Sequence, residues 1–420
     1  MLLVALSGAG IGLIAACWGL ARVPNLVLAP GVFLVLFSLA FVAYGCGAFA
    51  ASHLRSRVAV TTIVAIGLVA RAMLLPTAPS LSTDAYRYVW DARVAAAGID
   101  PYAYPPTAPE LAGLRDSRIY PRLNHPAWLS VYPPPAQAFF RAVYWIAPDS
   151  VAAMKTTLGV AELLALAALA LLLRALDLPA GRLVIYAWNP LLLVEIWGSG
   201  HLDALVLLTV TAAALASARQ RDALAAALLG VGTLVKLYPA ILFVLLPGRR
   251  RAPVIGAFAG VIAVGVVATG GPSHWPLAPI GRYVRDEYFN PGLVRSLVNE
   301  PTLAFAITAV WVIAFAWRGG AGRLTGQAVP LVTGFIVLSP SVFPWYAVWL
   351  VPLLAVTPSA PLIVFTGSVA FAYAFFLFEP WAIPWWARLI EVAPLGFAVA
   401  QELRLFSMEQ RGARASAGAE

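Results

Sequence analysis

The feature that most constrains this chain is a series of long apolar stretches that recurs along the whole sequence. A helix needs about 20 apolar residues to cross the hydrocarbon of a bilayer, and residues 2–20, 26–50, 58–75 and 151–173 all approach that length. Hydrophobic residues make up 61% of the 420 residues and charged residues 11%, whereas soluble domains carry about 25% charged residues. The sequence therefore predicts an all-α polytopic membrane protein.

Further apolar segments follow the first four. They span residues 183–197, 202–217, 224–235, 239–247, 253–270, 302–317, 329–342, 346–356, 361–377 and 388–400. Segments 239–247 and 346–356 are too short to cross alone, so we interpret them as half-helices or as parts of a neighbouring span. The prediction is a single integral membrane domain over residues 1–420, with a bundle of about 12–14 transmembrane helices.

The arginines predict how this bundle is oriented. Short loops that carry Lys and Arg stay on the cytoplasmic side of a membrane. Placing the N-terminus in the cytoplasm brings most short basic connections to that side, namely those with Arg55, Arg57, Arg174, Arg182, Arg219, Arg221, Arg249, Arg250 and Arg251. The C-terminus is then cytoplasmic too, and two long segments, 76–150 and 271–300, face outward. We expect a multi-pass protein of the plasma membrane, and the Arg- and Ala-rich composition suggests a bacterial source.

The first outer segment predicts a helix with a charged face. Ser82 or Thr83 is suited to cap a helix that ends near Gly98. Asp84, Arg87, Tyr88 and Asp91 would share one face of it. That face could offer a carboxylate base beside a cation for a phosphate. Alternatively, Asp84 complements the helix dipole and Arg87 pairs with Asp91, which spacing alone favours. Residues 136–147 predict a second amphipathic helix lying in the membrane interface.

Two charged positions stand out among the apolar segments. The run Gly198-Ser-Gly-His-Leu-Asp203 lies at an outer connection, where His201 and Asp203 could bind a polar ligand. Two ligands do not make a metal site, and Asp203 could equally serve as a helix-dipole partner. Lys236 lies deep in an apolar stretch, where an ionisable residue is a functional candidate, most naturally facing an anionic head group. Its alternative role is to snorkel toward the interface, although Tyr238-Pro239 favours a bend that lines a cavity.

The remaining polar candidates lie in outer connections. Arg282, Arg285 and Arg295, with Tyr288 and Asn290, suit a phosphate because arginine binds its oxygens bidentately. Asp286 and Glu287 could instead neutralise these arginines. His125 could bind a ligand, although a lone loop histidine is more often structural. Trp345 and Tyr346 belong to a Pro-broken aromatic rim that could line a sugar or lipid entry. The sequence has no Walker loop, GxSxG elbow, HExxH or CxxC motif, and no basic run interleaved with aromatics for nucleic acid.

Several short motifs occur in a recognisable order. They are Asp84-Ala-Tyr-Arg-Tyr-Val-Trp-Asp91-Ala-Arg93, Gly98-Ile-Asp-Pro-Tyr102, Leu114-Arg-Asp116, Asn124-His-Pro126, Tyr132-Pro-Pro134, Gly200-His-Leu-Asp203, Lys236-Leu-Tyr-Pro239 and Pro344-Trp-Tyr346. Over roughly residues 70–350 this order resembles GT-C glycosyltransferases. The resemblance is strongest to bacterial polyprenyl-phosphate-mannose-dependent mannosyltransferases and to the related glycosyltransferase family 87.

The resemblance implies an inverting hexosyltransferase that moves a sugar, most naturally mannose, from a polyprenyl phosphate to an acceptor hydroxyl outside the cytoplasm. The family's outer-loop acid, the general base, maps onto Asp84, with Asp91 as the second candidate. Arg87, Lys236, Arg282 and Arg285 are the candidates for binding the donor phosphate. Tyr88, His125, His201, Asp203, Tyr288, Asn290, Trp345 and Tyr346 are candidates for contacting substrate. The expected partners are the lipid-linked donor, a glycan or glycolipid acceptor of the cell envelope and the bilayer. No cofactor is assigned, and a divalent metal remains open.

Without the resemblance, the residues also allow a transporter or a flippase of a lipid-linked or anionic substrate. Transporters often carry internal repeats and paired broken helices, and we find no clear repeat between the two halves of this sequence. The position of Asp84, Lys236 and Arg282 distinguishes the two functions. A shared outward cavity favours an enzyme, and a central pathway open to both faces favours transport.

Overall fold

The computed structural model describes residues 2–317 and 324–417, with side chains described up to residue 401. These residues form helices, and their only β-type pairing is an isolated bridge between Pro291 and Ser341. Four helices are long and apolar enough to cross a membrane: α1 (Leu2–Arg22), α2 (Pro30–Ala51), α3 (Arg57–Leu74) and α6 (Val151–Ala175). The prediction of an all-α polytopic membrane protein is confirmed.

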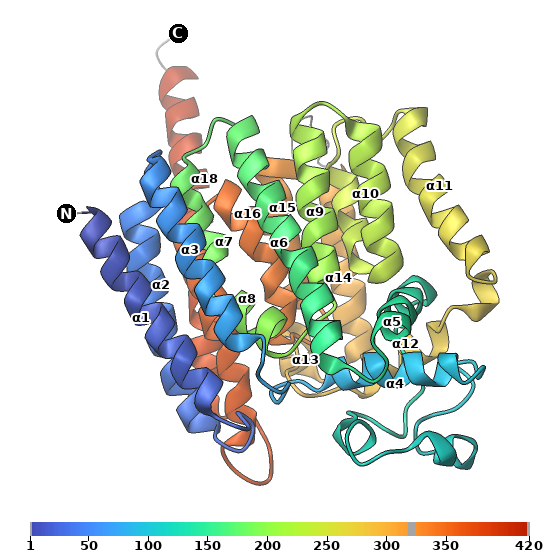
Figure 1. Cartoon of the computed structure of the whole chain (residues 1–420). Helices are drawn as coiled ribbons and strands as arrows, with labels where there is room; N and C mark the ends of the chain where they lie inside the picture. The colour runs from blue at the N-terminus through green and yellow to red at the C-terminus, as the bar shows by residue number, and fades with distance from the viewer. Residues whose placement is uncertain (1, 318–323, 418–420) are drawn as a thin grey trace.

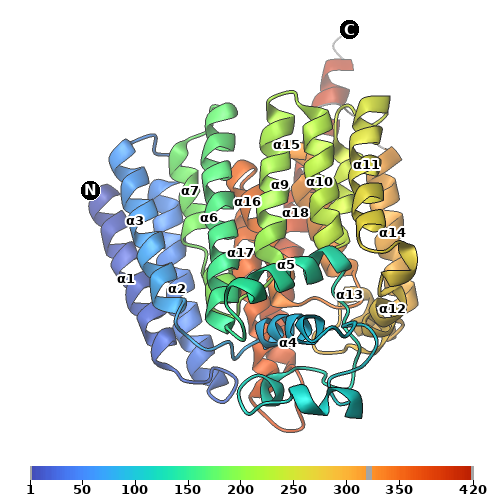
Figure 2. The same ribbon diagram turned by 45° about the vertical axis from the view of Figure 1, so that its right-hand side comes forward.

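Shorter apolar helices stand beside these four spans (Figures 1 and 2). They include α9 (Asp203–Ala218), α10 (Asp222–Val235), α14 (Pro301–Trp317) and α15 (Leu324–Leu338), and the long α18 (Trp385–Ala417) runs behind them. A further crossing could come from α11 (Ala252–Ala268), which continues into residues 272–286 after a bend of 74°. The total of about 12–14 spans stays a prediction, because length and composition identify only four or five full spans among the described residues.

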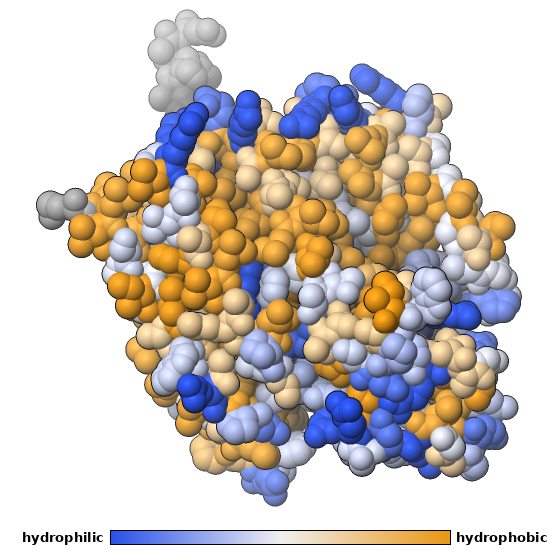
Figure 3. Space-filling model, in the orientation of Figure 1, coloured by the Kyte–Doolittle hydropathy of each residue, from blue (hydrophilic) through white to orange (hydrophobic). Residues whose placement is uncertain are grey.

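The surface agrees with a bilayer-embedded bundle. Figure 3 shows hydrophobic side chains in a broad band around the helices. Hydrophilic side chains gather along one edge, over the ends of α3, α6, α9 and α10, and again at the opposite end over α4. The first of these edges is where the sequence places Arg57, Arg174, Arg219 and Arg221. The basic connections at the ends of these four helices therefore lie at one end of the molecule.

The predicted span 183–197 is not a continuous helix. It is divided into α7 (Leu183–Ala187), the single turn α8 (Pro190–Leu192) and a π-helix, η4 (Leu193–Gly198). Asn189 explains the break, since its side-chain oxygen accepts from the backbone amides of Leu191 and Leu192, and Pro190 cannot donate. π-Turns occur frequently at functional sites, and this one carries Glu195.

The predicted half-helices are present. After α10 the chain is extended at Lys236, and a 3₁₀ helix, η5 (Tyr238–Leu245), follows. A second 3₁₀ turn, η7 (Pro344–Trp349), leads into the short α16 (Leu350–Val356). The segment beyond it is α17 (Ala360–Ser368) followed by η8 (Val369–Phe376). These breaks create helix ends inside the bundle.

The outer segments form a cap over one end of the bundle. In Figure 1, α4 (Asp84–Ala96) lies across the helices, with α5 (Pro134–Ile146) above it and η1 (Pro109–Leu114) and η2 (Tyr120–Arg122) in the loop below. The second outer segment contributes α12 (Leu277–Asp286) and α13 (Leu293–Val298). On α5, Phe140 is buried whereas Trp145 and Ile146 are more than 80% exposed, which fits the amphipathic helix predicted there.

A buried ion pair holds the helices beneath this cap. Arg71 on α3 donates from Nε and Nη2 to the two carboxylate oxygens of Glu162 on α6, at 2.9 and 2.7 Å. Trp197, at the end of η4, donates its indole N–H to the same carboxylate at 2.9 Å. Arg71 also donates to the carbonyl of Ala187 at 2.7 Å. The pair therefore fixes η4 against two full spans.

Candidate active site

Asp84, the first residue of α4, lies where the cap meets the bundle. Thr83 makes no side-chain cap bond, and the hydroxyl of Ser82 accepts only a long contact of 3.4 Å from the amide of Asp84. The helix N-terminus itself favours a negative charge here. Asn124, from the loop below, donates to Oδ1 of Asp84 at 2.5 Å, while Oδ2 lies 3.6 Å from Nδ1 of His201. The Asp84 side chain remains 14% exposed, so its carboxylate is oriented and still reachable.

His201 is completely buried between two acids. Its Nε2 lies 3.2 Å from Oε2 of Glu195, on the π-helix η4. The imidazole ring stacks on the indole of Trp345, with centroids 4.2 Å apart and planes 20° apart. The backbone turns at Gly200, whose φ of +78° favours glycine. The sequence Gly198–Asp203 thus folds into a turn that presents His201 to Asp84.

Lys236 and Asp203 form a second charged pair beside the first. Nζ of Lys236 lies 2.5 Å from Oδ2 of Asp203, and the hydroxyl of Tyr238 donates to the other carboxylate oxygen. The ammonium also lies 5.8 Å from the ring centroid of Tyr346. Asp203 is buried, whereas Lys236 is 15% exposed. The bend at Lys236 therefore presents a cation, held by a buried acid, toward the mouth of the bundle.

The charges around Asp84 determine its protonation state. Burial alone would raise the pKa of the Asp84 carboxyl, but His201, Lys236 and Asn124 outweigh it and lower that pKa below its ordinary value. Burial and then the carboxylate of Asp84 hold the pKa of the Tyr88 and Tyr132 phenols well above their ordinary range. Asp84 is therefore an ionised carboxylate at neutral pH, among neutral phenols. We refer to Asp84, Glu195, His201, Asp203 and Lys236 as the charged centre.

Arg87 and Asp91 pair with each other on the buried side of α4. Nε of Arg87 donates to Oδ1 of Asp91 at 2.8 Å, and Oδ2 of Asp91 accepts from Ser130 at 2.5 Å and from Gln137 at 2.8 Å. Both side chains are at least 95% buried. This is the structural alternative that the spacing favoured, and it leaves Asp84 as the accessible acid of the helix.

The two outer segments meet through His125. Its Nε2 lies 3.0 Å from Oε2 of Glu287, and its ring stacks on Trp128 with centroids 4.4 Å apart. The guanidinium of Arg282 lies 5.3 Å from the centroid of the Trp128 ring. Its Nε lies 3.3 Å from Asp286, and 56% of its side chain is exposed. Arg282 therefore stands at the rim rather than within the charged centre.

Of four further residues predicted for the site, Tyr88 lies beside the charged centre, and Arg285, Tyr288 and Asn290 do not contact it. Tyr88 accepts from the amide of Leu202 at 3.2 Å, one residue beyond His201. Arg285 and Tyr288 are exposed on the second outer segment. Asn290 is fully buried and donates to Glu391 at 2.8 Å and to the carbonyl of Val342 at 2.6 Å. The structure does not bring these last three side chains into contact with the charged centre.

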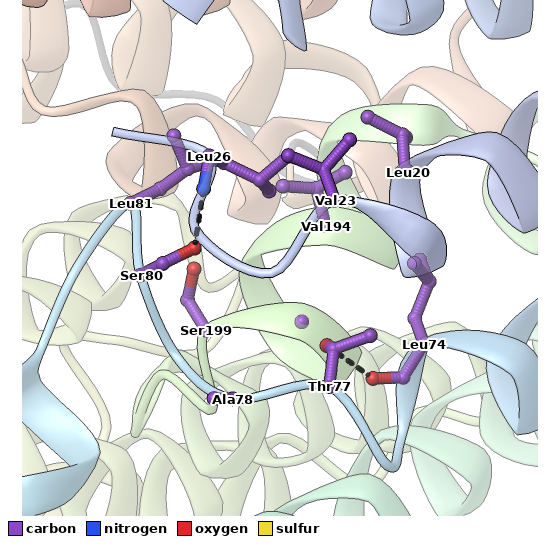
Figure 4. Close-up of a pocket in the computed structure, with 11 residues that line it drawn as sticks. Leu20, Val23, Leu26, Leu74, Thr77, Ala78, Ser80, Leu81, Val194 and Ser199 are labelled. Atoms are coloured by element: carbon purple, nitrogen blue, oxygen red, sulfur yellow. Dashed lines mark hydrogen bonds between the residues drawn. The ribbon is translucent and has the colours of Figure 1, made fainter. Parts of the chain in front are cut away.

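A separate, mostly apolar pocket lies beside the loop that leads into α4 (Figure 4). Leu20, Leu26 and Leu74 line it together with Ser80 and Ser199. Ser80 accepts from the amide of Leu26 at 3.1 Å. None of the residues that line it belongs to the charged centre, so the pocket does not define the candidate site. Within the described part of the chain, no three His, Cys, Asp or Glu side chains are arranged to hold a metal ion.

Sequence reasoning missed Glu195 and gave no role to Tyr373. Tyr373, on η8, donates its hydroxyl to Oε1 of Glu195 at 2.8 Å, although the two residues are 178 positions apart. Glu195 carries the same signal that singled out Lys236, an ionisable residue within an apolar run. Asn124, which appeared in the sequence only as part of the motif Asn124-His-Pro126, donates a hydrogen bond to Asp84.

The fold and the charged centre define a polytopic membrane protein with a carboxylate and a cation at one end of its bundle. A family model described as the N-terminal domain of alpha-(1->6)-mannopyranosyltransferases matches residues 1–248, more than half of the chain. The chain belongs to this family, and it is a mannosyltransferase. The matched region begins before α1 and includes all five residues of the charged centre. No curated protein and no solved structure matches the chain.

Proposed function

We propose that this mannosyltransferase takes mannose from a polyprenyl-phosphate donor and transfers it, with inversion, to an acceptor hydroxyl on the non-cytoplasmic face of the membrane. The observation that carries the proposal is the partly exposed carboxylate of Asp84, oriented by a hydrogen bond from Asn124 and lying 3.6 Å from the ring of His201 at one end of an apolar bundle. The family name suggests that the bond formed is an α-(1→6) linkage. A GT-C type of bundle fits the broken helices and the large first outer segment.

In the proposed reaction Asp84 is the general base. The acceptor hydroxyl gives its proton to the Asp84 carboxylate as its oxygen bonds to the anomeric carbon of mannose. The bond from that carbon to the phosphate oxygen breaks, and its electron pair leaves with the polyprenyl phosphate. A base in this role typically accelerates a reaction by about 10²–10⁴-fold, and the lowered pKa of Asp84 keeps it unprotonated at neutral pH.

Lys236 is the proposed partner of the leaving phosphate. Its ammonium acts on the charge of Asp84 and is held by the buried Asp203, so it is fixed in place before charge develops on the phosphate. Arg282 and Arg285, exposed on the second outer segment, would meet the donor head group at the rim. The phenol of Tyr132, which lies near the charge of Asp84 and is only partly buried, would supply a hydrogen bond for a sugar hydroxyl.

The proposed orientation places the charged centre outside the cytoplasm of a bacterial cell, with both chain ends inside. The basic helix ends lie at the opposite end of the bundle from α4 (Figures 1 and 3), and basic connections stay cytoplasmic. The donor would then reach the charged centre from the outer leaflet. The alternative of a transporter or flippase would need a pathway open to both faces, and the family supports an enzyme instead.

The test is transfer by the purified protein in detergent. The protein is given mannose labelled on polyprenyl phosphate, or GDP-mannose, with a manno-oligosaccharide acceptor, and the product linkage is determined. We expect transfer from the lipid donor alone. The variant Asp84→Asn should lose at least about 100-fold in rate. Asp100→Asn is the matched control, because Asp100 is an exposed acid of the same segment. Equal use of GDP-mannose, or full activity in Asp84→Asn, would contradict the proposal.

A further inference from the structure

The position of His201 between two carboxylates suggests a role beyond ligand contact. Both ring nitrogens of this buried side chain face acids, Asp84 at 3.6 Å and Glu195 at 3.2 Å. A neutral imidazole has one N–H and one lone pair, so a neutral ring would point its lone pair at one of two carboxylate oxygens. In a buried site that contact is strongly unfavourable. An imidazolium, in contrast, is attracted to both carboxylates through its charge, although neither ring nitrogen makes a hydrogen bond in this geometry.

The surroundings of Glu195 support a charged acid on the far side of the ring. Its Oε1 accepts from the hydroxyl of Tyr373 at 2.8 Å, which stabilises a carboxylate. Its backbone position is held because Trp197, on the same π-helix, donates its indole N–H to Glu162. Lys236, which also acts on the charge of Asp84, pairs with Asp203. Trp345 covers one face of the ring and carries no charge.

We infer that His201 is a positioning residue, held as an imidazolium by Glu195, and that it keeps Asp84 ionised and oriented for the reaction. This inference rests on the proposed role of Asp84 as the base. Glu195 acts through His201 and does not itself touch substrate. Glu195 and Asp84 lie beside different nitrogens of the His201 ring. Glu195 can therefore influence the reaction at Asp84 through the charge of that ring.

Two consequences are measurable. The pKa of His201 is raised to about 9, because the contacts with Asp84 and Glu195 outweigh the effect of burial, so the ring stays protonated up to that pH. Removing the imidazolium leaves Asp84 without its main cation. An opposite charge this close lowers the pKa of an acid by about 1–3 units, so the acid limb of kcat/KM should move to higher pH by a similar amount.

The first experiment is NMR of the full-length protein with ¹⁵N-labelled histidine. The chain has 4 histidines, and the His201 signals are assigned by their loss in His201→Gln. At pH 7.5 we expect both ring nitrogens of His201 to be protonated, whereas an ordinary histidine titrates near 6.5. Glu195→Gln should lower the pH at which this ring loses its proton. A neutral ring at pH 7.5 in the unmodified protein would overturn the inference.

The second experiment is the pH profile of mannose transfer. We expect the acid limb of His201→Gln, measured on its residual activity, to lie about 1–3 pH units above that of the unmodified protein. His53→Gln is the matched control, because His53 is exposed and pairs with the neighbouring Ser52, and its profile should not move. If His201→Gln is inactive, His201→Asn and Glu195→Asp take its place. An acid limb that stays in place would refute the inference while leaving the proposed function intact, and absence of transfer by the unmodified protein would refute the function instead.

Discussion

Replacing Arg71 with methionine should destabilise this protein by about 3–5 kcal/mol, because it leaves the carboxylate of Glu162 buried without its cation. Both side chains are at least 99% buried, and the guanidinium meets both carboxylate oxygens. In Arg71→Met that carboxylate keeps the indole N–H of Trp197 as a donor but has lost its cation. The free energy of unfolding can be measured from tryptophan fluorescence during titration of mixed micelles with a denaturing detergent.

The double variant Arg71→Met/Glu162→Met separates the ion pair from simple packing. It removes both charges together and leaves one unpaired indole N–H, which costs about 1–3 kcal/mol. It should therefore be more stable than either single variant. Arg55→Met is the matched control, because Arg55 pairs with Asp177 on the surface, where the side chains are 60% and 92% exposed, and such pairs contribute about 0–1 kcal/mol. A double variant as unstable as the sum of the two single variants would refute this reasoning.

Three further predictions concern the charged centre and its cap. Gly200→Ala should abolish most transfer, because a Cβ at φ +78° would lie 2.8 Å from Cγ of Lys155. Gly198→Ala is the control and should keep its activity, because its Cβ meets nothing within 4 Å. Equal transfer rates in the two variants would contradict the role of the turn. Lys236→Met should weaken binding of the lipid donor by at least about tenfold and Lys236→Arg should retain most of it, because a buried Asp203 needs a cation; unchanged donor affinity in Lys236→Met would contradict this. Glu287→Gln should raise KM more than it lowers kcat, because it breaks the contact with His125 that joins the two outer segments. An effect on kcat alone would contradict a role of that contact in substrate binding.

The hydrophobic pattern of the sequence predicted the spans well, because the length of apolar runs directly reflects the bilayer. It predicted both ends of α1, α3 and α6 to within two residues, and it placed the start of α2 four residues too early. It also predicted the break at Lys236, since Tyr238-Pro239 cannot continue a helix. The break at Asn189 was missed, because apolar residues surround it on both sides and its side chain caps the next turn internally.

The candidate site was predictable only in part. Asp84, His201, Asp203 and Lys236 come from separate segments, and nothing in their spacing says that His201 contacts Asp84 across 117 positions of sequence. Arg87 and Asp91 illustrate the reverse case, because sharing one helix face with Asp84 did not place them in the site. Long-range contacts such as Tyr373 with Glu195 depend on how helices pack, and a single sequence does not encode that pairing in any local pattern.

The central claim is that Asp84 acts in the chemical step. Donor binding and single-turnover transfer should be measured on the same preparation of Asp84→Asn, with mannosyl polyprenyl phosphate and a saturating acceptor. We expect donor affinity within a few-fold of the unmodified protein and transfer slower by at least about 100-fold. Transfer at the unmodified rate, or a loss explained entirely by weaker donor binding, would contradict it.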